Sequence, residues 1–422
     1  MKKMKLALSV VLIGLLCFSM FLVLAPMVKA QQSTVDWWPT FLHDASHTGY
    51  STSTGPLANQ LLWSYATGKA IDFSSPAVIN GVVYIGSTDN YVYALNAATG
   101  AFLWSYKTGG SVTSSPTVVN GVVYIGSQDH KVYALNAETG SKIWSYGTGD
   151  EVESSPTVAS GVVYVGSDDN KVYALNAANG SKIWSYGTGS AVVSSPAFVN
   201  GVVYVGSEDD NVYALNAATG SKLWSFGTGD EVESSPAVVN STVYVGSDDY
   251  NVYALSAETG SKIWSFGTGN TVDSSPAVVN NVVYIGSEDD NLYALNAASG
   301  SKIWSYTTGN VVDSAPAVAN GVVYVGSDDN NVYALNSTTG TTMWTYGTGN
   351  SVDSSPAVAN GVVYIGSDDN SLYAFGSITV PQPSPTVPEI PFGAVVLLAI
   401  SLVVSTILFK RFKNSTRNCA IS

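Results

Sequence analysis

Short apolar runs separated by turn residues recur every 40 residues through most of the chain. Within one repeat, four runs have the composition of β-strands: Ser194–Val199, Val202–Gly206, Asn211–Asn216 and Lys222–Phe226. The dipeptide Asn200-Gly201 separates the first two, and this pair is a strong signal for a two-residue hairpin. The pattern therefore predicts four short antiparallel strands in each repeat.

The repeat is marked by Ser-Ser-Pro just before or within its first strand. The marker begins at Ser74, Ser114, Ser154, Ser194, Ser234, Ser274 and Ser354, and Ser314-Ala315-Pro316 is its one variant. The second strand, Val202–Gly206, is apolar on both faces, so each small sheet must pack between two others. An open solenoid would need atypical capping repeats, and the end repeats here are ordinary. We therefore predict an all-β protein, an eight-bladed β-propeller of four-stranded antiparallel blades.

The two ends of the repeat region complement each other. A lone fourth strand, Leu61–Tyr65, precedes the first marker, while the last repeat, Ser354–Phe375, has only the first three strands. Pairing the N-terminal strand with the last repeat would complete the eighth blade and remove two free strand edges. We therefore predict a closed ring in which the N-terminal strand completes the last blade.

The termini have the composition of targeting segments. Residues 1–30 resemble a secretory signal peptide, with an uncleaved anchor as the alternative. A lead-in segment follows at 31–60, in which Trp37 and Trp38 are expected to cover the propeller edge, and the propeller spans 61–376. A Pro-rich linker at 377–391 precedes an uncharged segment at 392–409, just long enough for a transmembrane helix, or a helix of a sorting signal, and a basic tail at 410–422 that should stay in the cytoplasm.

Charge is scarce and unevenly distributed. Charged residues make up 11% of the chain, and the net charge is −14. Between residues 31 and 380 every cation is a lysine, and all acidic residues except Glu389 lie there. An acidic body of this kind disfavours nucleic acid, which is held by clustered Lys and Arg. Cys17 and Cys419 lie outside the repeats, so no disulfide or thiolate metal site is expected within them.

The third and fourth strands carry a family motif. The segment Ala134–Trp144 reads Ala-Leu-Asn-Ala-Glu-Thr-Gly-Ser-Lys-Ile-Trp and resembles the tryptophan-docking motif of pyrroloquinoline-quinone-type repeats, Ala-x-Asp-x-x-x-Gly-x-x-x-Trp. Asn136 stands where the family has Asp, and Asn can still bond a turn backbone. The lead-in from Trp38 to Gly49 is also similar to that of this family. The motif's tryptophans, which we expect to dock the blades, are Trp63, Trp104, Trp144, Trp184, Trp224, Trp264, Trp304 and Trp344.

The resemblance implies two classes of function. The family includes quinone- and calcium-dependent alcohol and sugar dehydrogenases, and also non-enzymatic propellers such as an outer-membrane assembly lipoprotein that scaffolds other proteins. The enzymes use one asymmetric axial site with a catalytic Asp, Glu and Asn calcium ligands, an Arg and often a cysteine pair. None of these can be placed here, because the repeats are nearly interchangeable and contain no Arg and no Cys. Pyrroloquinoline quinone is therefore not expected, and the chain is predicted to be non-catalytic.

Acidic residues are expected on one face of the ring, where the loops between blades and those joining the second and third strands lie. The lysines of the loops between the third and fourth strands should lie on the opposite face. One acid occurs in every repeat and is interpreted as a turn cap: Asp89, Asp129, Asp169, Asp209, Asp249, Asp289, Asp329 and Asp369. A second set could ring the channel mouth, with interruptions at Thr113 and Val193: Asp72, Glu153, Glu233, Asp273, Asp313 and Asp353.

The second set has two interpretations, simple solubility or a rim that binds cations such as Ca²⁺ or basic partners. His43 and His47 lie four residues apart in a segment that does not favour a helix, so a helical metal pair is not expected. The sequence thus predicts a monomeric, membrane-anchored propeller on the outer side of the cell membrane. We expect it to bind proteins, glycans or cations, with a dehydrogenase and an envelope assembly scaffold as alternatives.

Overall fold

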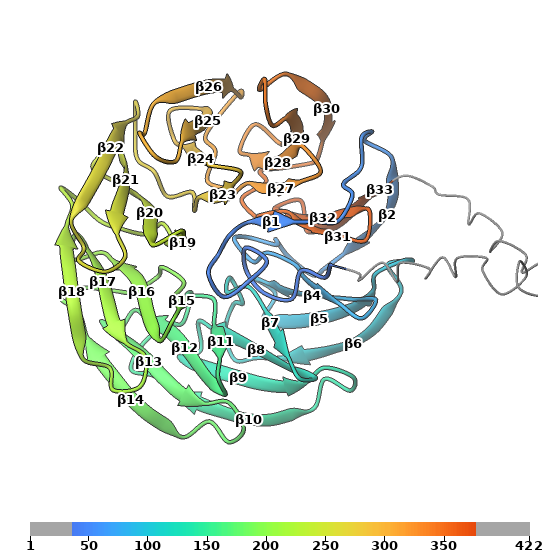
Figure 1. Ribbon diagram of the computed structural model, residues 1–422. Helices are drawn as coiled ribbons and strands as arrows, with labels where there is room; N and C mark the ends of the chain where they lie inside the picture. Colours follow the sequence, from blue (N-terminus) through green and yellow to red (C-terminus); the bar gives the residue numbers. More distant parts are fainter. Residues whose placement is uncertain (1–35, 377–422) are drawn as a thin grey trace, which may run out of the picture. The chain divides into compact units, whose positions relative to one another are not determined.

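The computed structural model describes residues 36–376, which form a ring of eight β-sheets (Figure 1). The predicted signal peptide, linker, apolar C-terminal segment and basic tail lie outside the described residues. Within 36–376 no helix is long and apolar enough to span a membrane. The predicted all-β eight-bladed propeller of four-stranded antiparallel blades is confirmed.

The first four blades follow the chain from the innermost to the outermost strand. Blade 1 is β3 (Ala77–Ile79), β4 (Val82–Ser87), β5 (Tyr91–Asn96) and β6 (Phe102–Lys107); blade 2 is β7 (Thr117–Val119), β8 (Val122–Ser127), β9 (Lys131–Asn136) and β10 (Lys142–Gly147). Blade 3 is β11 (Thr157–Ala159), β12 (Val162–Ser167), β13 (Lys171–Asn176) and β14 (Lys182–Gly187); blade 4 is β15 (Ala197–Val199), β16 (Val202–Ser207), β17 (Asn211–Asn216) and β18 (Lys222–Gly227).

The other four blades repeat this order, and the last is completed from the N-terminus. Blade 5 is β19 (Ala237–Val239), β20 (Thr242–Ser247), β21 (Asn251–Ser256) and β22 (Lys262–Gly267); blade 6 is β23 (Ala277–Val279), β24 (Val282–Ser287), β25 (Asn291–Asn296) and β26 (Lys302–Thr307). Blade 7 is β27 (Ala317–Ala319), β28 (Val322–Ser327), β29 (Asn331–Asn336) and β30 (Thr342–Gly347); blade 8 is β31 (Ala357–Ala359), β32 (Val362–Ser367), β33 (Ser371–Gly376) and β2 (Leu61–Ala66).

The innermost strand of each blade is shorter than the sequence pattern predicted. In blade 4 the first strand was expected at Ser194–Val199, but β15 begins at Ala197. Pro196 has no N–H to donate to a ladder, and the two serines before it bond to other blades instead. The Ser-Ser-Pro marker is therefore a connection between blades and not the start of a strand.

Two rings of hydrogen bonds run around the axis through these serines. The first serine of each marker accepts a bond from a glycine N–H of its own blade, as Ser114 does from Gly126. From blade 1 to blade 7 its hydroxyl also donates to the carbonyl of the next blade's serine, as Ser114 does to Ser154. A Cβ at Gly126 would lie 2.4 Å from the Val152 carbonyl oxygen, so only glycine fits there. The second serine accepts the N–H of its counterpart in the preceding blade at 2.9–3.0 Å, as Ser155 does from Ser115.

The predicted tryptophans also connect neighbouring blades. Seven of the eight indole N–H groups donate to a carbonyl 33 or 34 residues later at about 3 Å, as Trp104 does to Ala137, and the Tyr84 hydroxyl of the same blade donates to the same oxygen. The same arrangement recurs around the ring. For blade 7 the acceptor is supplied by the N-terminal segment, because Trp344 and Tyr324 both donate to Pro56.

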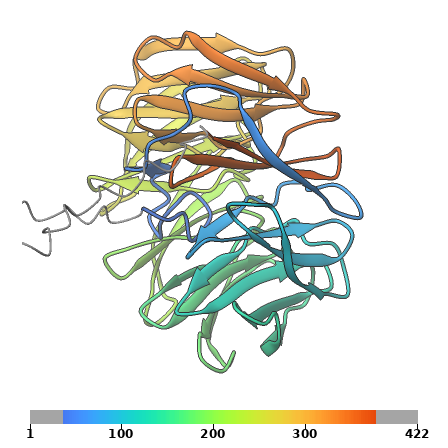
Figure 2. The same cartoon turned by 90° about the vertical axis from the view of Figure 1, so that its right-hand side faces the viewer.

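The N-terminal strand closes the ring as predicted. Strand β2 pairs antiparallel with β33, with Tyr65 opposite Leu372, and so supplies the outermost strand of blade 8. In Figure 2 this blue strand lies beside the red strands of the last blade. A further short strand, β1 (Tyr50–Ser51), pairs parallel with the innermost strand of blade 7 and makes that sheet five-stranded.

The lead-in takes a path that the sequence did not indicate. Trp38 was expected to cover the propeller edge together with Trp37, but it is 1% exposed and bridges Val78 of the innermost strand β3. Figure 1 shows the blue lead-in at the centre of the ring. From there its carbonyl groups accept N–H groups of innermost strands in blades 2, 4, 5, 6 and 7: Val118 to Pro39, Phe198 to Ala45, Val238 to Ser46, Val278 to Thr48 and Val318 to Gly49.

Histidine and serine side chains of the lead-in extend these contacts to the remaining blades. His47 is fully buried, with Nδ1 3.1 Å from the Pro236 carbonyl and Nε2 3.3 Å from the Thr157 hydroxyl of blade 3. The Ser53 hydroxyl accepts the Gly361 N–H of blade 8. The lead-in thus contacts every blade from inside the ring. Burial lowers the pKa of His47 to about 4, so it is neutral at physiological pH.

The ring of bonds between the second serines is interrupted at position 315, which allows a stability prediction. Position 315 is alanine, so it offers no hydroxyl to the Ser275 N–H. We expect A315S to raise the free energy of unfolding by about 0.5–1.5 kcal/mol by supplying this acceptor. Conversely, S115A should lower it by about 1–3 kcal/mol, because it leaves the buried Ser75 N–H unpaired. Denaturant unfolding measures both, and S145A, at an exposed position on β10, is the matched control.

Candidate functional site

A cavity of about 170 Å³ lies on the axis of the ring. Its wall contains the second serines of the markers, such as Ser155, together with Phe41 of the lead-in and five of the six acids predicted to ring the channel mouth. These five are Glu153, Glu233, Asp273, Asp313 and Asp353. The sixth, Asp72, lies beside Asp353. We call the six residues the rim acids.

A second group of carboxylates lies among the rim acids. These residues, which we call the loop acids, come from the loops between the second and third strands and from two of the loops between blades: Asp168, Glu208, Asp248, Glu288, Asp328, Asp368, Glu151 and Glu231. Carboxylate oxygens from the two groups approach within 4.8 Å of one another in four clusters. The clusters are Asp72 with Asp353 and Asp368, Glu151 with Glu153 and Asp168, Glu231 with Glu233 and Asp248, and Asp273 with Glu288 and Asp313.

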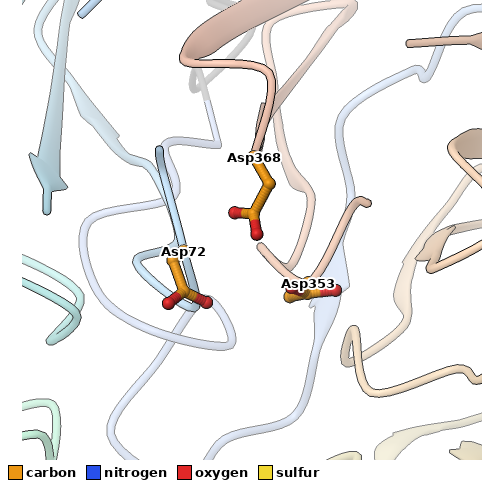
Figure 3. Close-up of side chains that lie close together, drawn as sticks. All are labelled: Asp72, Asp353 and Asp368. Carbon is orange, nitrogen blue, oxygen red and sulfur yellow. The ribbon is translucent and has the colours of Figure 1, made fainter. Parts of the chain in front are cut away.

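The first of these clusters spans the junction between blades 8 and 1. Figure 3 shows Asp72 and Asp353 on separate loops, with Asp368 between them. Blade 1 has one more residue than the other blades between its buried Ile71 and the marker serine Ser74. The added residue, Phe73, has a positive φ of 55° and is half-exposed. Asp72 therefore reaches the mouth although it is one position out of register with the other rim acids.

Within residues 36–376 the lysine ion pairs involve Asp129 and Asp169, and none involves a rim or loop acid. Burial and the Asp328 carboxylate raise the pKa of Asp313 to about 7. Burial and Asp248 raise the pKa of Glu233 to about 7, and burial and Asp368 raise that of Asp72 to about 6. Burial also raises the pKa of Asp273 and Asp353, each of which shares a close contact with a loop acid. The mouth therefore holds closely spaced carboxylates whose ionisation is opposed by burial and by one another.

A neutral side chain at the mouth is also without a partner. Thr113 occupies a rim position in blade 2 and is 8% exposed, and it lines the axial cavity. Within the described residues its hydroxyl oxygen makes no hydrogen bond. At a nearby position Gln128 donates to the Glu153 carboxylate at 2.6 Å, so one rim acid is partly satisfied by an amide. Carboxylates and an unpaired hydroxyl together offer oxygen acceptors to a positively charged group that enters from solvent.

The sequence missed the loop acids as individual site residues. It placed the second-to-third-strand loops on the acidic face, but it singled out only the aspartate present in every repeat. The residue just before that aspartate, such as Asp168 before Asp169, is the one that joins the rim clusters. This position is Asp or Glu in six blades and is Thr88 or Gln128 in the other two. That preference for an acid was the signal that could have identified the loop acids.

The invariant aspartates do more than bond their own turn. In blade 3 the Asp169 carboxylate accepts the Tyr173 hydroxyl of the third strand and the Gly149 N–H of the preceding loop between blades. The same pair of bonds forms at Asp89, Asp129, Asp209, Asp249, Asp289, Asp329 and Asp369. These residues tie the acidic-face loops together and are placed apart from the clusters of the mouth.

Comparison with known proteins agrees with this architecture. The family model of the outer membrane protein assembly factor BamB matches residues 52–154, 149–265, 208–312 and 307–379. The chain belongs to this family. Among curated proteins, none matches the chain in sequence.

Solved structures of the BamB type and of quinoproteins share the fold. BamB from Moraxella catarrhalis is 20% identical with a TM-score of 0.66, and the match covers 75% of this chain and 99% of that one. The computationally designed Ika8 protein is 19% identical (TM-score 0.68, 76% and 100% covered), and a europium-containing methanol dehydrogenase is 14% identical (TM-score 0.71, 81% and 98% covered). Members of this fold therefore include an assembly factor, a designed protein and an enzyme, so the fold alone does not determine the function.

The charge repulsion at the mouth gives a pH-dependent prediction. Because the pKa of Asp313 is raised from 3.8 to about 7, the folded state binds its proton more tightly than the unfolded chain does. Its contribution to stability is therefore present below about pH 4 and is lost as the pH rises through 7. D313N should raise the free energy of unfolding by about 1–3 kcal/mol at pH 8, after allowance for solvent screening, and change it little at pH 4.

Thermal or denaturant unfolding at the two pH values measures this difference. E258Q removes an exposed charge from the loop between β21 and β22 and serves as the control. A stabilisation of D313N that is equal at pH 4 and pH 8 would contradict the proposed repulsion.

Proposed function

We propose that this protein is a non-catalytic binding module outside the cytoplasm, and that its acidic mouth binds basic segments of partner proteins. The observation that carries the proposal is the concentration of rim and loop acids at one end of the axis, in clusters with oxygens within 4.8 Å. Such repulsion lowers stability at neutral pH, and perturbed titratable groups of this kind concentrate at functional sites. A cationic side chain at the mouth would relieve the repulsion.

The dimensions of the axial cavity favour a thin, extended group. At about 170 Å³ the cavity has room for a side chain such as lysine and is too small for a typical drug-sized ligand, which needs about 300 Å³ or more. The carboxylates would pair with the ammonium group, and the Thr113 hydroxyl could accept a further hydrogen bond. A Ca²⁺ ion is the second candidate ligand, supported by the four three-carboxylate clusters.

The residues at the axis do not fit a quinone cofactor that carries carboxylates. The cavity wall has acids and serines, and residues 36–376 contain no arginine to pair with the cofactor's negative groups. Phe41 of the lead-in takes up part of the axial space. These features favour the binding module over the alternative of a quinone- and calcium-dependent dehydrogenase.

The family and the terminal segments of the chain both support a location outside the cytoplasm. The family is named after an outer membrane protein assembly factor, and the N-terminal and C-terminal segments of this chain have the composition of a signal peptide and a membrane anchor. We propose an anchored, monomeric propeller facing away from the cytoplasm, in which an envelope assembly role would be one use of the acidic mouth.

The binding of a basic segment can be tested with defined peptides. We expect the full chain in detergent to bind an octalysine peptide in fluorescence anisotropy, with an affinity that falls as salt rises. The triple variant D273N/D313N/D353N should weaken binding at least about tenfold, because charged hydrogen bonds contribute about 1.5–3 kcal/mol each. The variant E138Q/E258Q, with changes in loops between third and fourth strands, is the charge control.

Equal binding of the peptide to the triple variant would exclude the mouth as the binding surface. Addition of Ca²⁺ during the titration separates the two candidate ligands, because a calcium site at the mouth would compete with the peptide. Incubation with pyrroloquinoline quinone and Ca²⁺, followed by dye-coupled oxidation of alcohols and sugars, tests the enzyme alternative. Stoichiometric quinone binding with turnover would overturn the non-catalytic assignment.

A further inference from the structure

A second and larger cavity lies away from the mouth, between the lead-in and blades 5 and 6. Its volume is about 760 Å³, within the usual range for small-molecule sites. The lead-in contributes Asp36, His43, Asp44 and Tyr50 to its wall, among other residues. The hairpin between β19 and β20 and that between β23 and β24 form the opposite side. None of the rim or loop acids lines it.

The repeat pattern is broken at the two hairpins that line this cavity. In six blades the second residue of the hairpin is glycine with a φ of 76–83°. Blade 5 has Ser241 at this position and blade 6 has Asn281, with φ values of 62° and 63°. A positive φ is readily adopted by glycine and is uncommon for other residues. Two adjacent blades therefore carry a side chain where the other six have none, and Asn281 lines the cavity.

The charged groups of the cavity are already paired within the lead-in. Asp36 accepts hydrogen bonds from Thr52 and Ser51 and lies 3.0 Å from His43 Nε2. Asp44 accepts bonds from Ser46 and Thr48. Burial opposes a charge on His43, but the two carboxylates outweigh it and raise its pKa. Asp36, His43 and Asp44 therefore need no external counterion. No lysine or arginine is among the residues that line the cavity, so nothing there attracts an anion.

The other polar groups of the wall are neutral. The asparagines of the two hairpin tips, Asn240, Asn280 and Asn281, are exposed to solvent, and with the partly buried Tyr50 they line the cavity. Each amide offers two donors and one acceptor. Val239, Val279 and the half-exposed Ile263 add an apolar surface beside them. The wall thus combines neutral hydrogen-bonding groups with aliphatic and aromatic surface.

We propose that this cavity is a binding site for an uncharged saccharide. A sugar ring presents hydroxyl groups at its edge and C–H groups on its face, which match the amides and the apolar surface of the wall. An anion would meet the two carboxylates, and a purely apolar ligand would leave the three amides without water or partners. The volume accommodates a ligand of two or three sugar units. The site is independent of the acidic mouth.

Calorimetric titration of the full chain with neutral trisaccharides tests the proposal. The probes are maltotriose, cellotriose, mannotriose and fully N-acetylated chitotriose, and the detergent must have no sugar headgroup. We expect saturable binding of at least one probe. N281G restores the glycine of the other blades and should weaken binding about tenfold through loss of its hydrogen bonds, and Y50F should weaken it severalfold.

The matched control places the same change at a remote hairpin. G201N introduces asparagine in blade 4, where a Cβ meets no atom within 4 Å, and should leave binding unchanged. The proposal is overturned if none of the four sugars binds at millimolar concentration, if N281G binds as well as the parent, or if G201N weakens binding equally. Binding of glucosamine or glucuronate alone would likewise exclude an uncharged ligand.

Discussion

Neighbouring blades satisfy each other's buried polar groups, and the remainder of the fold depends on this exchange. The Ser115 N–H of blade 2 is paired by Ser155 of blade 3, and the Trp104 and Tyr84 donors of blade 1 share the Ala137 carbonyl of blade 2. Each buried donor left unpaired would cost about 1–3 kcal/mol, so a blade without its neighbour loses several such contributions at once. The same requirement explains the closure, in which Pro56 supplies the carbonyl that blade 7 would otherwise lack.

The sequence predicted what is repeated and local, and it failed where the contacts are long-range and unique. Hairpin signals, apolar runs and the phase of the ends were enough to predict the strands, the eight blades and the pairing of β2 with β33. The path of the lead-in could not be predicted, because backbone carbonyls such as that of Ala45 make its bonds and leave no side-chain pattern. The loop acids were placed on the correct face, but their approach to the rim acids depends on loop geometry that sequence does not specify.

In a ring this uniform, departures from the repeat are informative when their structural causes can be separated. Phe73 is explained by the junction of blades 8 and 1, where one additional residue shifts Asp72 by one position. Ser241 and Asn281 lie far from that junction in sequence, and each has a positive φ at a position where the other six blades have glycine. Of the two, Asn281 lines the larger cavity, which is the departure that the proposed ligand site uses.

The rigidity of the ring determines how the acidic mouth responds to its surroundings. The serine hydrogen bonds hold the backbone of the loops that carry Glu233, Asp273 and Asp313, which limits how far these carboxylates can move apart. Protonation or a bound cation relieves the remaining repulsion. Because burial and like charges raise the pKa of Asp313 and Glu233 to about 7, acidification would protonate the mouth before it protonates ordinary surface carboxylates. The affinity of the mouth for positive charge must then fall over the range just below neutrality, where most other acids of the chain keep their charge.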